Sequence, residues 1–210
     1  MRYAPLVLAV ATLARTPSVA AAETRPSVTL RVRLYDASQI ATARRIDMIR
    51  SATAILERTG VTPEWIVCGV GGSANDRDSC SRRPAAHELV MRLVRRPLQQ
   101  APREVLPLGD AHVDSSSKAG TLATIYVDAI ESLAHATGCA IATLLGRVVA
   151  HEIGHLLLGT ARHATIGLMR AVWTPDELKQ NRPGDWVFPP RDARRLRVAT
   201  QRRHGDARSR

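Results

Sequence analysis

The chain has 210 residues, of which 45% are apolar and 23% are charged, and its formal net charge is +11 at pH 7. This length suits one domain with a tail, and it is enough to bury a core without help from disulfides. The composition excludes an intrinsically disordered chain, and three cysteines are too few for a scaffold built on disulfides. Aromatic residues make up only 3% of the chain, so smaller aliphatic side chains must fill the core.

The first 22 residues are typical of a cleavable export signal. Arg2 provides a positive start, residues 5–13 form a short apolar run, and residues 18–22 (SVAAA) provide the small side chains of a cleavage site. The apolar run is too short to span a bilayer. We therefore predict a secreted or periplasmic protein that is cleaved after Ala22 and has no transmembrane segment in its mature chain.

The next part of the chain shows the patterns of short strands and one helix. Residues 28–35 (VTLRVRLY) alternate apolar and polar side chains, as a half-buried strand does. A helix follows, with Asp36 or Ser38 as its cap and Gly60 as its stop signal. Further along, the sequence predicts a turn-rich loop at 69–84 and strands at 61–68, 88–94 and 111–113. Residues 120–130 are predicted to be a strand that runs into the start of a helix.

One long apolar helix dominates the second half of the chain. It is predicted at 140–158 and ends at Gly159, and the polar residues within it make it unsuited to cross a bilayer. A short helix is predicted to start near 173–177, and an Arg-rich helix or tail follows at 191–210. The order of the elements predicts an α/β or α+β domain with a mixed sheet over residues 23–190.

Two of the three cysteines flank a short loop, residues 69–79, that contains Gly, Ser and Asn. In the oxidising compartment that export implies, Cys68 and Cys80 can close this loop as a disulfide. Cys139 is then left without a partner. We expect it to be buried as a small apolar side chain, and a disulfide between two chains is the alternative.

The most informative segment is residues 150–169, AHEIGHLLLGTARHATIGLM. His151 and His155 are four residues apart, so on a helix both imidazoles project from one face and can reach a single Zn²⁺. Glu152 lies beside the first of them, and its carboxylate can move a proton between an attacking water and a leaving group. A mostly apolar helix seldom carries these three groups without a partner, which favours a metal site.

This segment resembles the metzincin signature of zinc metallopeptidases. In that family the helix with two histidines ends at a glycine, a third histidine ligand follows, and a turn that contains a methionine lies under the metal. The matching residues here are Gly159, His163 and Met169. The resemblance, which is to small secreted bacterial members, implies a mixed, mostly parallel twisted sheet with an active-site helix and a short C-terminal subdomain.

The third ligand is where the sequence departs from the family pattern. The glycine comes four residues after His155 and the third histidine eight after it, whereas the family has three and six. A wider turn after Gly159 would still deliver His163 to the metal. Glu177 is the alternative third ligand, in an arrangement like that of thermolysin, although an acid at this position also suits the first turn of a helix.

The resemblance and the residues together predict a zinc metalloendopeptidase with one catalytic Zn²⁺. Its expected partner is a peptide or protein substrate, with no specific nucleic acid. If residues 120–123 form the sheet edge beside the cleft, they can pair with an extended peptide. Asp128 and Glu131 could orient a ligand imidazole, although a solvated role at a helix start competes with that one. The alternative function is a non-catalytic, zinc-containing exported protein that binds peptides or polyanions.

Overall fold

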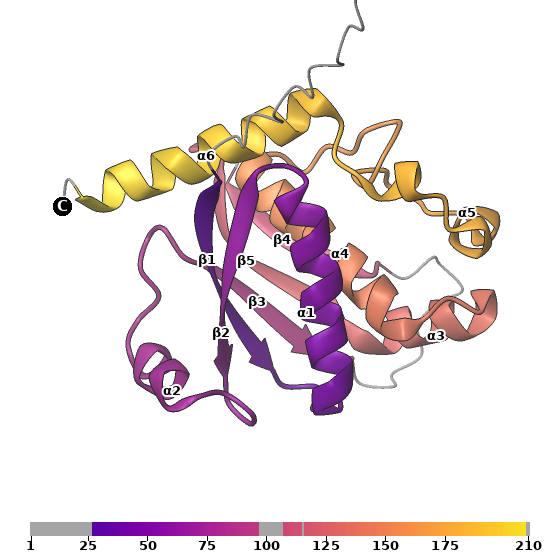
Figure 1. Cartoon of the computed structure of the whole chain (residues 1–210), viewed down its shortest axis with the longest axis horizontal. Helices are drawn as coiled ribbons and strands as arrows, with labels where there is room; N and C mark the ends of the chain where they lie inside the picture. The colour runs from indigo at the N-terminus through magenta and orange to yellow at the C-terminus, as the bar shows by residue number, and fades with distance from the viewer. Residues whose placement is uncertain (1–26, 97–106, 115, 209–210) are drawn as a thin grey trace, which may run out of the picture.

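The computed structural model of the chain describes residues 27–96, 107–114 and 116–208. The predicted export signal at 1–22 lies outside these residues. Within them, five strands form a single twisted sheet with helices packed against it (Figure 1). The strands are β1 (Val28–Asp36), β2 (Val61–Cys68), β3 (Leu89–Val94), β4 (Gly109–Asp114) and β5 (Ala119–Tyr126).

The sheet has the strand order β2-β1-β3-β5-β4. The first four strands in this order are parallel, and β4 pairs antiparallel with β5. This arrangement confirms the predicted mixed, mostly parallel sheet. The expectation that residues 120–123 form the sheet edge is wrong, because β4 folds back along β5 and occupies the edge itself. The prediction that residues 120–130 are a strand running into a helix start is confirmed, because β5 ends at Tyr126 and a helix begins at Val127.

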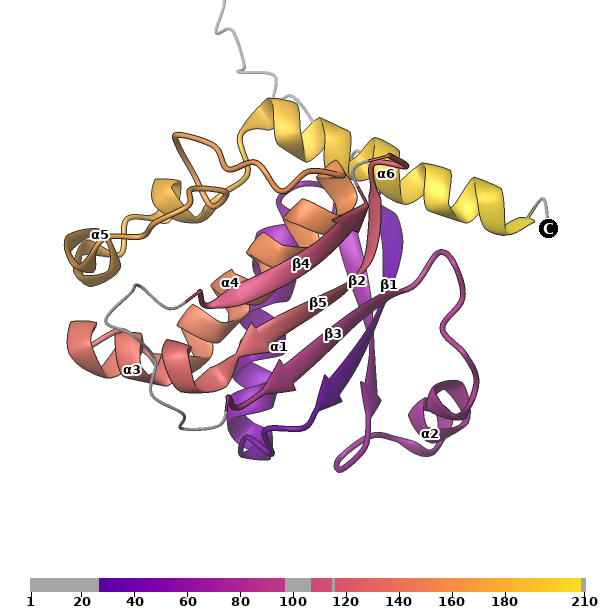
Figure 2. The same ribbon diagram turned by 180° about the vertical axis from the view of Figure 1, so that it is seen from behind.

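Two long helices cover one face of the sheet. Helices α1 (Thr42–Glu57) and α4 (Ile141–Leu158) pack against each other, and Figure 2 shows the strands in front of them when the molecule is seen from behind. Helix α6 (Pro190–Arg208) crosses one end of the sheet (Figure 1). The remaining helices are α2 (Ala74–Ser81), α3 (Val127–Thr137), α5 (Pro175–Gln180) and a short 3₁₀ turn at Pro183–Trp186.

The core lies between the sheet and the α1–α4 layer. Alternate residues of β1, namely Leu30, Val32 and Leu34, are almost fully buried, as the alternating pattern predicted. Among the described residues α4 is the one helix long and apolar enough to cross a membrane, but 78% of it is buried inside the protein. It is therefore the central helix of the core, which explains its apolar composition.

Two local predictions are corrected by the structure. Residues 69–84 contain the helix α2, because the side chain of Ser73 accepts a hydrogen bond from the backbone of Asp76 and the Asp76 carboxylate accepts one in return. The first helix starts at Thr42 without a side-chain cap. Asp36 instead accepts hydrogen bonds from Ser38 and forms an ion pair with Arg45.

The cysteines divide as the sequence suggested, with one difference. Cys68 at the end of β2 and Cys80 in α2 form a disulfide, which holds α2 beside the sheet. Cys139 is half-buried rather than buried, and its sulfur lies 3.8 Å from a guanidinium nitrogen of Arg147. Cys139 nevertheless packs against the hydrophobic core, so the expectation of an apolar environment is met in part.

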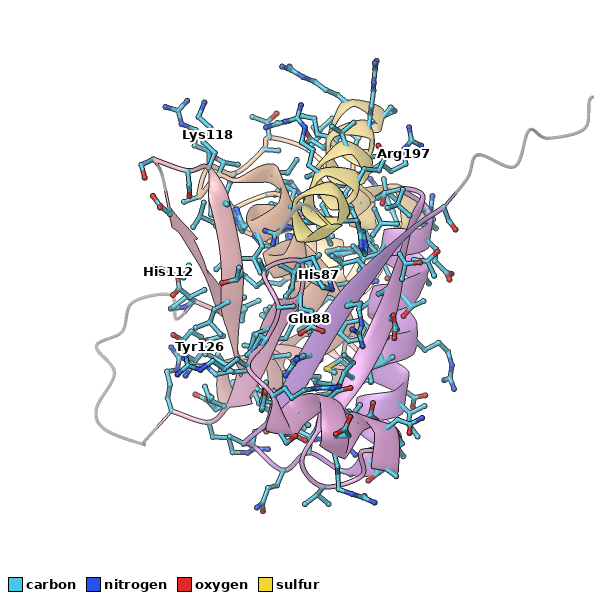
Figure 3. All side chains as sticks on the ribbon, turned by 90° about the vertical axis from the view of Figure 1, so that its left-hand side faces the viewer. His87, Glu88, His112, Lys118, Tyr126 and Arg197 are labelled. Atoms are coloured by element: carbon cyan, nitrogen blue, oxygen red, sulfur yellow. A yellow bond between two sulfur atoms is a disulfide. The ribbon has the colours of Figure 1, made fainter. Side chains whose placement is uncertain are left out.

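A buried ion pair joins β1 to the segment before β3. The guanidinium of Arg33 lies 2.6 Å from a carboxylate oxygen of Glu88, and both side chains are at most 4% exposed. Glu88 lies close to β1 in Figure 3. Arg33 also donates a 2.7 Å hydrogen bond to the carbonyl of Arg82, and Glu88 accepts one of 3.0 Å from the backbone of Ala85. These bonds attach residues 82–88 to the sheet.

We expect Glu88→Gln to destabilise the protein by about 3 kcal/mol, because it leaves the buried Arg33 guanidinium without a counter-charge. Urea unfolding with the disulfide intact measures the loss. The matched control is Glu64→Gln, which breaks the ion pair between Glu64 and Arg31. The Glu64 side chain is 53% exposed, so this change should cost less than about 1 kcal/mol. Equal, small losses in the two variants would contradict a structural role for the buried pair.

Candidate metal centre

Helix α4 brings His151 and His155 together on one face. Their side chains are buried, with ring centroids 4.6 Å apart and the two Nε2 atoms 2.9 Å apart. The helix continues for less than one turn beyond His155 and ends at Gly159, which has a left-handed backbone with φ of 63°. The spacing of four residues therefore produces the convergence that the sequence predicted.

Backbone carbonyls fix the protonation of both rings. The Nδ1 atom of His151 lies 2.8 Å from the carbonyl oxygen of Leu168, and that of His155 lies 2.7 Å from the carbonyl oxygen of Thr160. A carbonyl only accepts hydrogen bonds, so each Nδ1 carries the hydrogen and each Nε2 presents a lone pair. The two Nε2 lone pairs lie 2.9 Å apart, and they repel each other unless a cation binds both of them. The donor set thus fits a metal ion.

Burial keeps these two imidazoles neutral. It lowers the pKa of His151 to about 4 and also lowers the pKa of His155 below its usual value, in both cases mainly through loss of solvent. A neutral imidazole is the form that binds metal. The pair is therefore ready to act as ligands at neutral pH, without first losing protons.

His163 completes a group of three histidines. One ligand atom from each of His151, His155 and His163 lies within 4.8 Å of the others, and His163 is the exposed member. The chain reaches this position by turning back at Gly159, where a Cβ atom would lie 2.0 Å from the carbonyl oxygen of Lys118. The longer spacing after the second histidine is therefore accommodated in the turn, and the three histidines are positioned to hold one metal ion.

A turn that contains Met169 packs against helix α4 between the two histidines. Met169 is buried, and its sulfur lies 2.6 Å from the place where a Cβ on Gly154 would stand. Gly154 is thus the residue that allows the turn to approach the helix between the two histidines. The turn includes Gly167, which has a φ of 72°, and Leu168, whose carbonyl accepts the hydrogen bond from His151. This turn sets the orientation of the first imidazole.

Glu152 lies in the wall of a pocket next to the histidines. The pocket has a volume of about 180 Å³, and it is also lined by His151, His163 and Gly109. The Glu152 side chain packs against the start of β4, where a Cβ on Gly109 would be 2.5 Å from its carboxylate oxygen. Burial raises the pKa of Glu152 to about 8, and the nearby Asp110 carboxylate adds a smaller contribution. This carboxyl can both hold and release a proton near neutral pH.

The structure does not bring the other predicted acids to this group. Glu177 caps α5 through Thr174 and forms an ion pair with Arg170. Asp128 pairs with Arg96, and Glu131 forms ion pairs with arginines outside the site. The partners that orient the ligand imidazoles are backbone carbonyls instead.

The sequence did not indicate several other residues of the pocket wall, among them Gly109, Arg170 and Trp173. Gly109 is the first residue of β4, and Arg170 and Trp173 lie in the segment that follows Met169. Trp173 donates a hydrogen bond to the same Leu168 carbonyl that accepts from His151. None of the three has a spacing relative to the histidines that would have indicated the contact.

Comparison with known proteins gives matches among solved structures. No family model and no curated protein sequence matches the chain. Among solved structures, it is similar to archaemetzincin from Methanopyrus kandleri, with 15% identity and a TM-score of 0.44 over 88% of this chain and 99% of that one. The arrangement of the three histidines, rather than this likeness, carries the functional conclusions that follow.

The raised pKa of Glu152 predicts how the metal-free protein responds to pH. Because the folded state holds its proton up to about pH 8 and a free glutamate loses it near 4.5, the folded state loses relative stability as the pH rises between these values. In chelator-treated protein, Glu152→Gln should therefore gain up to about 4 kcal/mol relative to the wild type between pH 5 and pH 8, as measured by urea unfolding. His151 is present in both proteins, so its own titration cancels.

The matched control for this comparison is Glu177→Gln. The pKa of Glu177 is lowered, mainly by its hydrogen bonds with Thr174 and also by Arg170, so its carboxyl stays ionised in both folded and unfolded states from pH 5 to pH 8. Its difference from the wild type should not change over this range. A constant difference for Glu152→Gln as well would show that the carboxyl is not buried as described.

Proposed function

We propose that this protein is an exported zinc-dependent metallopeptidase, with His151, His155 and His163 as the metal ligands and Glu152 as the general base and acid. The observation that carries the proposal is the convergence of the two Nε2 lone pairs, which the Leu168 and Thr160 carbonyls enforce. The nearby Glu152 carboxyl distinguishes the group from a purely structural metal site, which needs no proton acceptor.

The ligand set favours zinc. Zn²⁺ binds imidazole nitrogen readily, and zinc hydrolases use three protein ligands and leave one position open. Here the pocket of about 180 Å³ adjoins His151 and His163 and provides the space for that position. A zinc ion held there supplies Lewis acidity, which polarises a scissile carbonyl and lowers the pKa of a water molecule.

Glu152 then carries the proton. It accepts a proton as water attacks the carbonyl carbon of the peptide, and it returns the proton to the nitrogen of the leaving amine as the C–N bond breaks. In the metal-free protein burial raises the pKa of this carboxyl, and a zinc ion on the neighbouring histidines would lower that pKa again through its positive charge, which favours the carboxylate that accepts the proton. The reaction is a hydrolysis that consumes one water and regenerates the carboxylate.

The edge of the sheet favours a peptide as the substrate. Among the described strands, β4 has a neighbour on one side only, and its first residue, Gly109, lines the pocket beside Glu152. An extended peptide can add to such an edge through its backbone and present a carbonyl to the pocket. The predicted signal at residues 1–22 and the Cys68–Cys80 disulfide support an exported location.

Glu152→Gln should reduce peptide hydrolysis by about 100-fold or more, because the amide cannot take the proton of the attacking water. The mature protein should contain close to one zinc per chain before and after the change. Metal analysis together with turnover of a peptide library measures both quantities, and Glu177→Gln is the control that should stay active. Undiminished hydrolysis by the Glu152 variant would contradict the proposed mechanism.

His163→Ala and Glu177→Ala separate the two candidates for the third ligand. Loss of a true ligand should weaken zinc retention by more than about 100-fold, a larger effect than loss of an orienting partner. Competition with a chelator of known affinity measures the difference between the variants. Zinc loss in the Glu177 variant, with retention in the His163 variant, would favour the thermolysin-like ligand set instead.

A further inference from the structure

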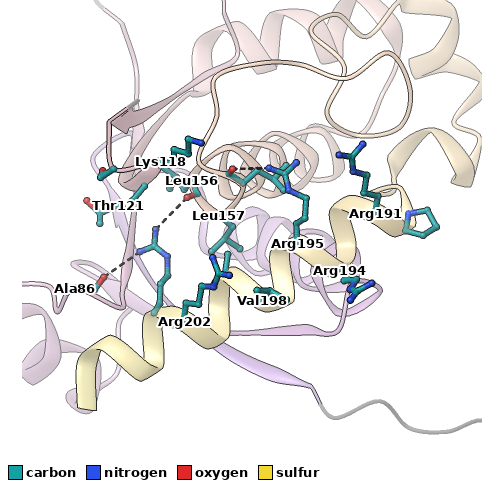
Figure 4. Close-up of a pocket in the computed structure, with 16 residues that line it drawn as sticks. Ala86, Lys118, Thr121, Leu156, Leu157, Arg191, Arg194, Arg195, Val198 and Arg202 are labelled. Carbon is teal, nitrogen blue, oxygen red and sulfur yellow. Dashed lines mark hydrogen bonds between the residues drawn. The ribbon is translucent and has the colours of Figure 1, made fainter. Parts of the chain in front are cut away.

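A second hollow, larger than the pocket at the histidines, lies between α6 and the end of α4 (Figure 4). Its volume is about 990 Å³. The lining includes apolar side chains from the last turn of α4, Leu156, Leu157 and Leu158, together with Val198 of α6. The β4–β5 hairpin forms another part of the lining, and Lys118 stands at its exposed tip (Figure 3). We refer to this hollow as the α6 groove.

Cationic side chains surround the α6 groove. They are Lys118, Arg191, Arg194, Arg195, Arg202 and Arg203. No acidic side chain lines it within the described part of the chain. Of these cations, Arg195 is paired with Asp192 at 3.6 Å, and no described carboxylate pairs with the other five. The groove therefore concentrates positive charge over an apolar lining.

Arg203 shows how this charge is built into the fold. It donates hydrogen bonds to the carbonyls of Ala86, Gly120 and Leu156, two of which are drawn in Figure 4. Burial lowers the pKa of Arg203, so the folded protein accepts a desolvated guanidinium at this place. Arg203 thus joins α6 to β5 and α4, and it fixes one end of the groove.

We propose that the α6 groove binds an acidic polypeptide segment that has apolar side chains among its carboxylates. Arginine forks form paired hydrogen bonds with carboxylates, and the leucine and valine side chains can cover apolar side chains of the ligand. The helix from Arg191 to Arg202 is about 17 Å long at 1.5 Å per residue, so an extended segment of about five residues spans it. Five or more residues can therefore meet several cations at once.

Other polyanions fit the groove less well. Its lining has no aromatic side chain among the described residues, so the bases of a single-stranded nucleic acid would find nothing to stack on. A lipid bilayer would need apolar side chains on the outer surface of α6. The exposed positions there outside the groove include Gln201 and Gly205, whereas the apolar Val198 faces the groove.

The α6 groove lies close to the histidines along the chain. Its floor is formed by the residues that directly follow His155 on α4. A protein held by an acidic segment in the groove would thus be kept near the pocket beside Glu152. The inference does not depend on peptide hydrolysis, because binding is measured without turnover, and Glu152→Gln should bind the segment as the wild type does.

The test uses the mature protein and fluorescently labelled peptides of about eight residues. One peptide alternates glutamate with leucine or alanine, a second replaces every glutamate by glutamine, and a third contains glutamate alone. Fluorescence anisotropy should show saturable binding of the first peptide that weakens as salt is added. The glutamine peptide should bind at least ten-fold more weakly, and the glutamate-only peptide should also bind more weakly, because it leaves the leucines uncovered.

Arg194→Glu with Arg202→Glu should weaken binding of the first peptide at least ten-fold, while the thermal midpoint stays close to that of the wild type because both side chains are exposed. The matched control is Arg58→Glu with Lys179→Glu, which makes the same change in net charge at exposed sites outside the groove and should bind normally. Val198→Asn tests the apolar contribution and should weaken the mixed peptide more than the glutamate-only peptide.

Three outcomes would overturn the proposal. The first is equal loss of binding in the groove variant and its control, which would assign binding to net charge alone. The second is binding of oligothymidine that is tighter than binding of the first peptide, and the third is tighter binding of vesicles rich in phosphatidylglycerol. Each is measured at the same salt concentration as the peptide, and each counts only if the groove variant abolishes it. Loss of hydrolysis in Glu152→Gln with peptide binding intact would leave the groove proposal standing. Hydrolysis by the wild type without saturable binding of the first peptide would overturn the groove proposal and leave the proposed hydrolysis unaffected.

Discussion

The central constraint in this structure is the opposition of two imidazole lone pairs on adjacent turns of one buried helix. The carbonyls of Leu168 and Thr160 hold the hydrogen of each ring on Nδ1, so His151 and His155 direct unprotonated Nε2 atoms at each other from 2.9 Å. Such an arrangement is unfavourable by itself and becomes favourable when a cation accepts both lone pairs. His163 and the pocket beside Glu152 lie next to this pair.

Much of the fold serves to keep the two rings in place. Helix α4 is buried between the sheet, α1 and the segment around Met169, which leaves the imidazoles little freedom to rotate. Gly154 lets the methionine turn approach, and Gly159 turns the chain back towards His163. Away from the site, the Arg33–Glu88 pair and the Cys68–Cys80 disulfide secure the loop segments on the far part of the sheet. His151 and His155 thus belong to the buried core, and His163 comes from an exposed loop.

The sequence could predict the features that depend on local periodicity. The alternation in β1, the glycine stop after α4 and the four-residue spacing of the histidines all appear in the structure as expected. The features that depend on long-range contacts could not be predicted in this way. The edge position of β4, the carbonyl partners of the imidazoles and the contact of Gly109 with Glu152 join residues distant in the chain. Helix α2 was missed for a local reason, because its Ser73 and Asp76 capping box lies in a stretch with the composition of a turn.

X-ray absorption at the zinc edge tests the central claim most directly, since it reports the ligand atoms around the metal without relying on activity. For the zinc-loaded mature protein we expect three imidazole nitrogens at about 2.0–2.1 Å and one further oxygen ligand. In His163→Ala the spectrum should show two imidazoles. A wild-type spectrum that requires sulfur ligands, or that shows fewer than two imidazoles, would contradict the convergence of His151 and His155 on one ion.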